Sequence, residues 1–315
     1  MMDKNNYRIA AIDIGTNSFH LIIAELSKNK KIKLLDRARV FLRIGNIKKD
    51  GVNIISSQDI DAAVNVLINF KQMAELYKAK ISAVATSAVR ESSNNKEFVK
   101  IIFEKTGIKI NIIDGRTEAK LIFLGMKNAL DLDGSKALGI DIGGGSTEFI
   151  YAVDNKVKYA ESLKIGAVRL SNIFFPKYII SKSSISDCEN YVEDLIRKQI
   201  ELTSISKIDF AVGSSGTVDT ICLIKSNQTE GSERKKLNGY EFSYDDFENI
   251  YDLLMNLKSP EERMLVPGLE AKRADIIPAG LIILKKIFQV FNINKMVLSE
   301  YALREGVVLK AMKSI

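Results

Sequence analysis

A glycine-rich turn follows an apolar stretch near the middle of the chain and carries residue types that bind phosphate. The three glycines at positions 143–145 leave backbone N–H groups unshielded, so these groups can close on phosphate oxygens, and Ser146 adds a hydroxyl donor. Asp141 before the turn and Glu148 after it can hold a hard cation such as magnesium, directly or through water. A plain hairpin turn is the alternative interpretation of the glycines alone.

An internal repeat strengthens the phosphate interpretation. The segment Ile12–Ser18 recurs as Ile140–Ser146, a displacement of 128 positions, with Asp, Gly and Ser aligned. The same displacement sets Val84–Ser87 over Val212–Ser215, in each case an apolar strand that runs into a small, polar turn. One offset for two separate segments indicates duplication, and two copies of a phosphate-type turn favour phosphate binding over a chance hairpin.

Three further features have possible roles in such a site. Gly213–Gly216 is another turn of glycines and hydroxyls, at a symmetric position of the repeat. Arg90 can clamp a phosphate by a bidentate contact, or it is a solvated residue at a helix start. Glu118 begins a helix, where its carboxylate serves either as a partner of the helix dipole or as a base for water.

Composition excludes several mechanisms. His20 is the single histidine, so His-rich zinc sites and triads with a histidine base elsewhere are excluded, and base chemistry falls to carboxylates or lysine. We expect His20 to be packed or hydrogen-bonded in a strand. The net charge of +7 favours the approach of polyanions, although a lysine-rich solvated surface explains it equally well.

The remaining composition indicates a globular protein of a reducing compartment. Cys188 and Cys222 have no metal or redox spacing and are expected to be buried, reduced thiols. Apolar runs such as Ile276–Leu284 are far too short to span a bilayer. We therefore expect a cytoplasmic protein without a membrane partner.

Each half of the chain reads as a three-stranded meander followed by helix, strand and helix. Ser56 with Asp59, and Ser184 with Asp187, have the spacing of capping boxes at helix starts. Further helices are predicted over residues 96–106, 116–130, 244–257, 271–291 with a break near Pro278, and 303–312. A polar segment over 226–243 is predicted to be a surface loop.

The length of 315 residues predicts two domains. We place the first at residues 1–126 and the second at 127–299, with a C-terminal helix at about 300–315 that packs back on the first. Two similar halves with a short connection usually enclose a cleft, and such clefts favour ligands. The site is therefore expected between the domains.

Several motifs together resemble the exopolyphosphatase and guanosine pentaphosphate phosphatase family, in the family's order and over nearly the whole chain. They are Ala11–Ile22, Ala85–Glu91, Gly115–Leu121, Gly139–Phe149, Gly213–Leu223, Arg273–Gly280 and Leu303–Gly306. The resemblance implies an α/β fold of the duplicated ribonuclease H-like type, as in the actin-like ATPase superfamily, with the active site in an interdomain cleft. It also implies magnesium dependence and release of a terminal phosphate from polyphosphate or guanosine pentaphosphate.

The same resemblance assigns roles to residues. Glu118 corresponds to the catalytic glutamate that polarises the attacking water, Arg90 to a phosphate-contacting arginine, and Asp141 and Glu148 to the metal site. The phosphate contacts implied are Asp13, Gly15, Thr16, Asn17 and Ser18 in the first turn, Gly143, Gly144, Gly145 and Ser146 in the second, and Gly213, Ser214, Ser215 and Gly216 in the third. The family commonly has two adjacent acidic residues at the catalytic position, and Thr117 replaces the first of them here.

The sequence therefore predicts an exopolyphosphatase with Glu118-activated water and magnesium. The motifs also suit a guanosine pentaphosphate 5′-phosphohydrolase, and more distantly an actin-like metabolite kinase or a non-catalytic sensor of polyphosphate or an alarmone. The chain resembles the short form of the family, which lacks a C-terminal His-Asp domain. We expect no nucleic-acid partner, and a homodimer on base rates alone.

Overall fold

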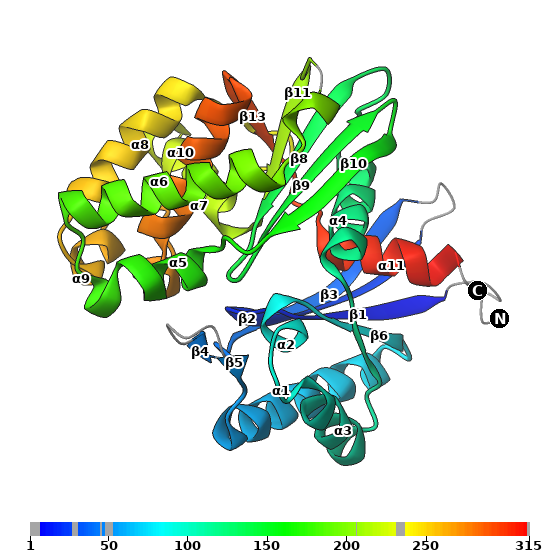
Figure 1. The fold of residues 1–315 in the computed structure, drawn as a ribbon. Helices are drawn as coiled ribbons and strands as arrows, with labels where there is room; N and C mark the ends of the chain where they lie inside the picture. The colour runs from blue at the N-terminus through cyan, green and yellow to red at the C-terminus, as the bar shows by residue number, and fades with distance from the viewer. Residues whose placement is uncertain are drawn as a thin grey trace. The chain divides into compact units, whose positions relative to one another are not determined.

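The chain divides into two compact units. The computed structural model describes residues 7–26, 31–44, 46–47, 53–205, 207–230 and 237–313. Unit 1 comprises Met1–Asn128 with Tyr301–Ile315, and unit 2 comprises Ala129–Glu300. Each unit has its own β-sheet with helices packed on it (Figure 1). Unit 1 is thus built from both ends of the chain.

Unit 1 contains a five-stranded mixed sheet in the order β3-β2-β1-β6-β7. Its first three strands form the predicted antiparallel meander, and β6 and β7 add parallel strands. The elements are β1 (Arg8–Ile14), β2 (Ser18–Leu26), β3 (Ile32–Phe41), β4 (Asn46–Ile47), β5 (Asn53–Ile54), α1 (Ser57–Leu76), β6 (Lys80–Ala85), α2 (Ser87–Arg90), α3 (Asn95–Thr106), β7 (Ile110–Ile112), α4 (Gly115–Ala129) and α11 (Leu303–Lys313).

Unit 2 contains a six-stranded sheet in the order β10-β9-β8-β11-β13-β12. It also opens with an antiparallel meander, to which β11 and β13 add parallel strands. The elements are β8 (Lys136–Ile142), β9 (Thr147–Val153), β10 (Lys156–Leu163), α5 (Ala167–Phe174), η1 (Pro176–Tyr178), α6 (Lys182–Gln199), η2 (Leu202–Ser204), β11 (Phe210–Ser214), α7 (Ser215–Glu230), β12 (Glu241–Ser243), α8 (Tyr244–Asn256), α9 (Pro260–Met264), η3 (Ala271–Arg273), α10 (Ile277–Phe291) and β13 (Lys295–Leu298).

The two sheets repeat one topology. The order β3-β2-β1-β6 of unit 1 corresponds to β10-β9-β8-β11 of unit 2, and a further parallel strand follows in each. The repeated topology confirms the duplication that the sequence repeat predicts, in the ribonuclease H-like α/β fold that the family resemblance implies.

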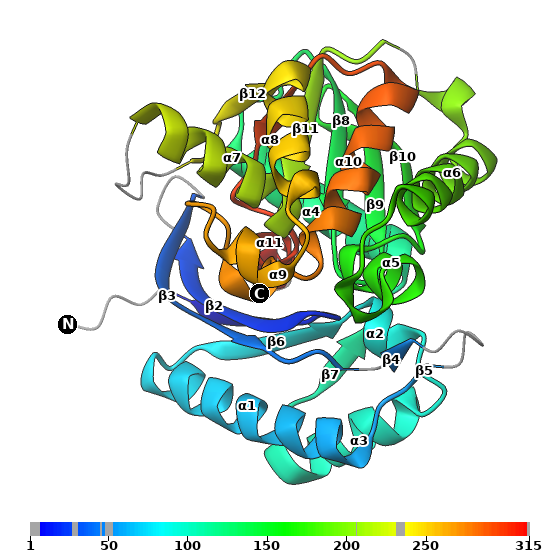
Figure 2. The same ribbon diagram turned by 90° about the vertical axis from the view of Figure 1, so that its left-hand side faces the viewer.

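Helices bury one apolar face each against these sheets. In unit 1, α1 contributes Ile60, Val64 and Leu67 to the core, because residues three and four apart share a helix face. α1 and α3 cover one face of the sheet and α11 packs on the other (Figure 1). In unit 2, α6, α8 and α10 lie on one face of the sheet (Figures 1 and 2).

The sheet register brings the polar turns of each unit together. In unit 1, Ile14 at the end of β1 pairs with Ala85 at the end of parallel β6. In unit 2, Asp141 near the end of β8 pairs with Ser214 at the end of parallel β11. Because parallel strands end at the same edge of a sheet, the residues that follow them are neighbours in space.

Most helix ends agree with those predicted from the sequence, with three differences. Ser56 caps α1, its hydroxyl accepting a hydrogen bond from the Asp59 amide, and Gly107 ends α3 with φ +73°. The capping box predicted at Ser184 is wrong: Ser181 caps α6, and Ser184 is the third residue of that helix and bonds back to it. α10 starts before Pro278, which occupies the first turn, where a missing N–H costs nothing, so the break lies upstream of it.

The third difference concerns the polar segment predicted as a loop over 226–243. Its first residues, through Glu230, belong to α7, and Ser226 is buried. Its last residues form β12, while 231–236 lie outside the described residues. Polar composition alone did not distinguish a helix end from a loop.

Two predictions about the whole chain can be compared with the structure. No described helix is long and apolar enough to cross a membrane. Cys188 and Cys222 are free and buried, and burial raises the pKa of both thiols, that of Cys188 to about 12. The expected burial of both free thiols is therefore confirmed, and their raised pKa favours the protonated form.

Candidate active site

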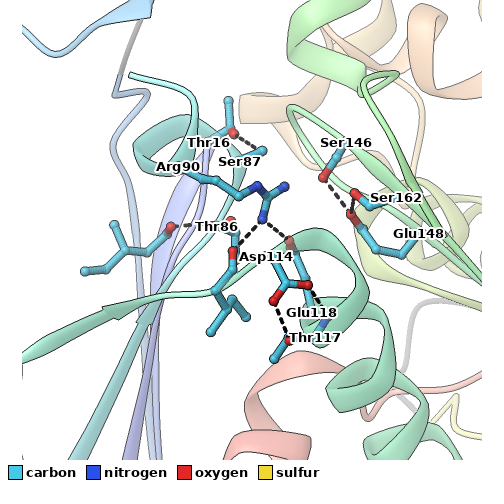
Figure 3. A network of polar contacts seen from close by, with 12 residues as sticks. Thr16, Thr86, Ser87, Arg90, Asp114, Thr117, Glu118, Ser146, Glu148 and Ser162 are labelled. Carbon is cyan, nitrogen blue, oxygen red and sulfur yellow. Dashed lines mark hydrogen bonds and ion pairs between the residues drawn. The ribbon is translucent and has the colours of Figure 1, made fainter. Parts of the chain in front are cut away.

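Arg90 and Glu118 form an ion pair in unit 1. Arg90 ends α2 and Glu118 lies in the first turn of α4. The Arg90 Nη1 atom donates to Glu118 Oε2 at 2.8 Å and to the Ile113 carbonyl at 2.9 Å (Figure 3). Only 6% of Glu118 is exposed. The two residues expected to do chemistry in this unit are thus in direct contact, which holds the carboxylate in one orientation.

The start of α4 is stabilised by Asp114, which lies at its N-cap. Asp114 accepts hydrogen bonds from the Thr117 backbone N–H at 2.9 Å and from the Thr117 hydroxyl at 2.7 Å (Figure 3). The Thr117 hydroxyl is the main cause of a lowered pKa at Asp114. Thr117, which replaces an acidic residue of the family pattern, therefore fixes the helix turn that carries Glu118.

The β1–β2 turn of unit 1 is closed by its own backbone and by hydroxyls. The Gly15 amide donates to the Ser18 carbonyl at 3.2 Å, and the hydroxyls of Thr16 and Ser87 are 2.9 Å apart (Figure 3). Asn17 Oδ1 accepts from Arg43 Nε at 3.0 Å. Thr16, Asn17 and Ser18 are buried, and Asp13 lies on β1 just before them. Unit 1 thus gathers the predicted first turn beside the segment that leads to Arg90.

The β8–β9 turn of unit 2 repeats this closure, with the Gly143 amide donating to the Ser146 carbonyl at 2.9 Å. The start of α5 packs directly against it. Backbone amides of residues 167–169 donate to the carbonyls of Gly143 and Gly144, and Arg169 Nε donates to the Gly145 carbonyl at 2.7 Å. A Cβ at Gly166 would lie 2.5 Å from the Gly144 carbonyl oxygen, so this approach requires glycine. The carbonyl side of the turn is thereby occupied by α5.

Asp141 and Glu148 lie directly opposite one another on β8 and β9. Both are buried, with 6% and 1% exposed. Asp141 accepts hydrogen bonds from the hydroxyls of Ser214 at 2.5 Å and Ser215 at 2.7 Å. Glu148 Oε1 accepts from Ser146 and Ser162, each at 2.7 Å (Figure 3). The two carboxylates thus come from opposite positions of paired strands, and each accepts hydrogen bonds from two hydroxyls.

This donor set fits a magnesium ion. Oxygen ligands are those that magnesium prefers, and it is usually held by one or two carboxylates with water and phosphate oxygens completing the shell. Like charges placed opposite one another destabilise a sheet, so a divalent cation would relieve the cost of burying both. Among the described residues no cluster of three or more His, Cys, Asp or Glu side chains offers an alternative cage.

The third predicted turn joins β11 to α7. Ser215 has φ +68°, a left-handed conformation that is unusual for serine, and its hydroxyl reaches Asp141. A Cβ at Gly216 would meet the Arg273 guanidinium, so glycine is required for Arg273 to cover the start of α7. Arg273 Nε donates to Glu270 Oε2 at 3.2 Å. The turn therefore supplies two hydroxyls to an acidic residue and seats a cation beside Gly216.

Within unit 1 the structure brings together Arg90 and Glu118, and within unit 2 it brings together Asp141, Glu148, Ser146, Ser214 and Ser215. Sequence reasoning missed Ser162, Arg43 and Arg169. The meander register could have found Ser162, because that residue stands opposite Glu148 on β10. The other two come from segments with no local motif. The expected location of the site between the domains stays a prediction.

Comparison with known proteins gives concordant matches. The model of the Ppx/GppA phosphatase family matches residues 21–315. A "Putative exopolyphosphatase" of Haemophilus influenzae is 32% identical over 99% of this chain and 94% of its own length. A "Bifunctional 3-dehydroquinate synthase/phosphatase" of Fusobacterium nucleatum is also 32% identical over 99% of this chain, which spans only about half (47%) of that relative.

Solved structures agree over the full length of the chain. A crystal structure described as an exopolyphosphatase from Cytophaga hutchinsonii has a TM-score of 0.87 and 27% identity, covering 98% of both chains. The Aquifex aeolicus member of the Ppx/GppA family has a TM-score of 0.82 and 26% identity, covering 98% of this chain and 99% of its own.

Proposed function

Because the chain belongs to the Ppx/GppA phosphatase family, we propose that it is an exopolyphosphatase, which hydrolyses the terminal phosphoanhydride of inorganic polyphosphate and releases orthophosphate. The observation that carries the proposal is the buried Glu118 carboxylate, fixed by Arg90 at 2.8 Å in the first turn of α4. A fixed carboxylate in a partly enclosed position is suited to take a proton from water.

In the proposed reaction, the oxygen of a water molecule bonds to the terminal phosphorus while the bond from that phosphorus to the bridging oxygen breaks. Glu118 accepts a proton from the water, and the shortened chain leaves with the bridging oxygen as an anion. Arg90 holds Glu118 before substrate arrives, and its guanidinium can then contact a phosphate oxygen. Most of the catalysis is positioning and stabilisation of charge.

The glycine and hydroxyl turns are proposed to hold phosphate oxygens. Thr16 and Ser18 offer hydroxyls in unit 1. In unit 2, where the Gly143 amide closes the turn on the Ser146 carbonyl, Gly144 and Gly145 offer backbone N–H groups. The carbonyls of the second turn are engaged by α5, which supports an orientation with the N–H groups toward a ligand. The net charge of +7 would favour the approach of a polyanion.

Asp141 and Glu148 are proposed to hold magnesium, together with water and phosphate oxygens. When bound there, the ion would neutralise charge on the phosphate groups. The hydroxyls of Ser162, Ser214 and Ser215 orient the two carboxylates toward that role.

The experiment that tests the proposal measures phosphate release from long-chain polyphosphate with magnesium, beside guanosine pentaphosphate and ATP. Glu118→Gln should lower the rate of release from polyphosphate by about 100-fold or more, because it removes the base, while binding of polyphosphate changes little. Glu104→Gln is the matched control, since that carboxylate is exposed on α3, and it should keep the full rate.

Each other outcome supports a different function. Release from guanosine pentaphosphate alone would make the protein an alarmone phosphatase. Nucleotide-dependent phosphorylation of a metabolite would support the kinase alternative, and binding of polyphosphate without release would support the sensor. Normal turnover by Glu118→Gln would show that the base is a different residue.

A further inference from the structure

The only histidine of the chain connects the first turn to the C-terminal helix of the same unit. His20 lies on β2, and its Nε2 atom is 2.8 Å from the Ser18 hydroxyl oxygen. Its Nδ1 atom is 3.4 Å from Nη1 of Arg304, which lies on α11. A chain of hydrogen bonds therefore runs from Arg304 through His20 to Ser18.

The chemistry of the two partners fixes the direction of this chain. A guanidinium has only donors, so the His20 Nδ1 atom must accept from Arg304 and cannot carry a hydrogen. In the neutral imidazole the hydrogen is then on Nε2, which donates to the Ser18 hydroxyl oxygen. The Ser18 hydroxyl hydrogen is consequently directed to a partner other than His20, and Ser18 acts as a donor from within the phosphate-type turn.

Arg304 is held in place by a close packing of α11 on α4. A Cβ at Gly306 would lie 1.9 Å from the Leu121 carbonyl oxygen, and a Cβ at Gly125 would lie 2.2 Å from the Ala302 carbonyl oxygen. Gly306 of α11 thus lies against the backbone of α4, and Gly125 of α4 lies against the residue that precedes α11. Since α4 also carries Glu118, one rigid pair of helices holds both the proposed base and the arginine that fixes His20.

The sequence repeat provides an independent comparison. His20 stands 128 positions before Glu148, at the same place of the repeat, opposite Asp13 as Glu148 is opposite Asp141. Each bonds to the serine two residues before it, at 2.8 Å in unit 1 and 2.7 Å in unit 2. Both halves have the serine contact. The residue that makes it is a carboxylate in unit 2 and an imidazole in unit 1, where a cation contacts the imidazole.

We propose that His20, fixed by Arg304, is a positioning residue that directs the Ser18 hydroxyl as a donor to a phosphate oxygen of the substrate. This inference rests on the proposed phosphohydrolase function. It assigns a role in phosphate binding to α11, exerted by Arg304 through His20.

The first test is NMR spectroscopy of the imidazole in ¹⁵N-labelled protein without a histidine tag. Because His20 is the only histidine, its two ring nitrogens give the only imidazole signals. We expect an unprotonated Nδ1 and a protonated Nε2 at pH 7.5, and a mixture of tautomers in Arg304→Met. A neutral ring protonated on Nδ1, or an imidazolium, would overturn the proposal.

The second test separates positioning from a structural effect by kinetics with tripolyphosphate. Arg304→Met should raise KM about three- to tenfold with little change in kcat, the effect of one ordinary hydrogen bond. Arg304→Lys, which keeps an N–H donor, should recover most of the loss. Lys313→Met, an equivalent change at an exposed position of α11, should have no effect.

A double-mutant cycle completes the test. In a Ser18→Ala background, Arg304→Met should cause no further rise in KM, because the hydroxyl that it orients is gone. Additive effects of the two substitutions would overturn the proposal. Failure of the proposed function gives a different result, because no phosphate would then be released from any polyphosphate. The role of His20 would still be decided by its tautomer and by the Kd for tripolyphosphate in the same variants.

Discussion

The β1–β2 turn of unit 1 and the β8–β9 turn of unit 2 are copies of one backbone with different charge partners. His20 and Glu148 occupy the same place, and each contacts the preceding serine of its turn. In unit 1 the chain of contacts continues to the cation Arg304, whereas in unit 2 Glu148 is met by the Ser162 hydroxyl. The duplicated backbone thus fixes where the serine contact is made, and the residue type at that position decides whether its other partner is a cation or a hydroxyl.

The difference extends to the neighbouring strand. In unit 1, Ser87 after β6 contacts the Thr16 hydroxyl. In unit 2, Ser214 at the end of β11 and Ser215 after it contact the Asp141 carboxylate instead. Unit 1 therefore pairs its Glu118 carboxylate with Arg90 and sets an imidazole and hydroxyls beside the first turn. Unit 2 gathers two carboxylates, which suit a cation.

Glu148→Gln tests the cationic assignment of unit 2 and should have the largest effect among the variants of this comparison. Loss of a proposed magnesium ligand should lower turnover of polyphosphate by about 100-fold or more, roughly 3 kcal/mol, and raise the magnesium concentration needed for half-maximal rate. Titration of the rate with magnesium measures both. The exposed Glu201→Gln serves as control, and an unchanged magnesium requirement in Glu148→Gln would refute the metal assignment.

Arg90→Lys tests the role assigned to Arg90 in unit 1. Lysine keeps the charge but not the planar guanidinium, which here contacts both Glu118 and the Ile113 carbonyl. We expect kcat/KM for polyphosphate to fall about 10- to 100-fold, the cost of a hydrogen bond to a charged group. Steady-state kinetics measure this fall, with Arg39→Lys on the surface strand β3 as the control. Equal values of kcat/KM for the two variants would contradict the assignment.

Arg263→Met should reveal a difference in stability between the units. Arg263 is fully buried in unit 2 and donates to the carbonyls of Leu254, Leu257 and Ala274, and burial lowers its pKa. Leaving these carbonyls without their donor should cost about 3 kcal/mol. Urea unfolding measures the loss.

The location of that loss can be read from the thiols. Both cysteines lie in the core of unit 2, so Arg263→Met should increase their rate of alkylation in the native protein. Arg197→Met, on the exposed side of α6, is the matched control. Equal alkylation rates in the two variants would mean that Arg263 does not stabilise unit 2 selectively.

Thr117→Val should have the smallest effect, confined to the start of α4. Without the hydroxyl donor, the pKa of Asp114 should rise toward its ordinary value of 3.8. Because a lowered carboxyl pKa stabilises the fold above the unfolded value, the variant should be slightly less stable at pH 6, and the difference should shrink as the pH falls below about 3.8. NMR titration of the carboxyl carbon and urea unfolding at both pH values check this, with Thr203→Val as control.

Local chemistry explains which features the sequence could predict. Ser56, Gly107 and the two meanders were predicted correctly because a cap, a left-handed stop and an alternating strand pattern depend on neighbours in the chain. The start of α6 was misplaced because Ser181 and Ser184 both have the right spacing to a following polar residue, and only packing selects between them.

The features that the sequence did not predict depend on contacts between residues far apart in the chain. Arg90 and Glu118 were each predicted as site residues, but not that they touch, because their contact depends on where α2 and α4 end and begin in space. His20 meets Arg304 across 284 positions of sequence, which no periodicity reports. The proximity of Ser146, Asp141 and Glu148 in unit 2 was easier to predict, because the three residues belong to one hairpin.

The discontinuous composition of unit 1 also constrains the order in which the protein acquires its structure during synthesis. Unit 2 is one continuous stretch of chain and can complete its core as soon as residue 300 has left the ribosome. Unit 1 cannot, because α11 packs on β1 and is translated after all of unit 2. The first strands must therefore wait for α11 to cover their sheet until unit 2 has been translated. That interval is when the nascent protein is most exposed to misassembly and most in need of a chaperone.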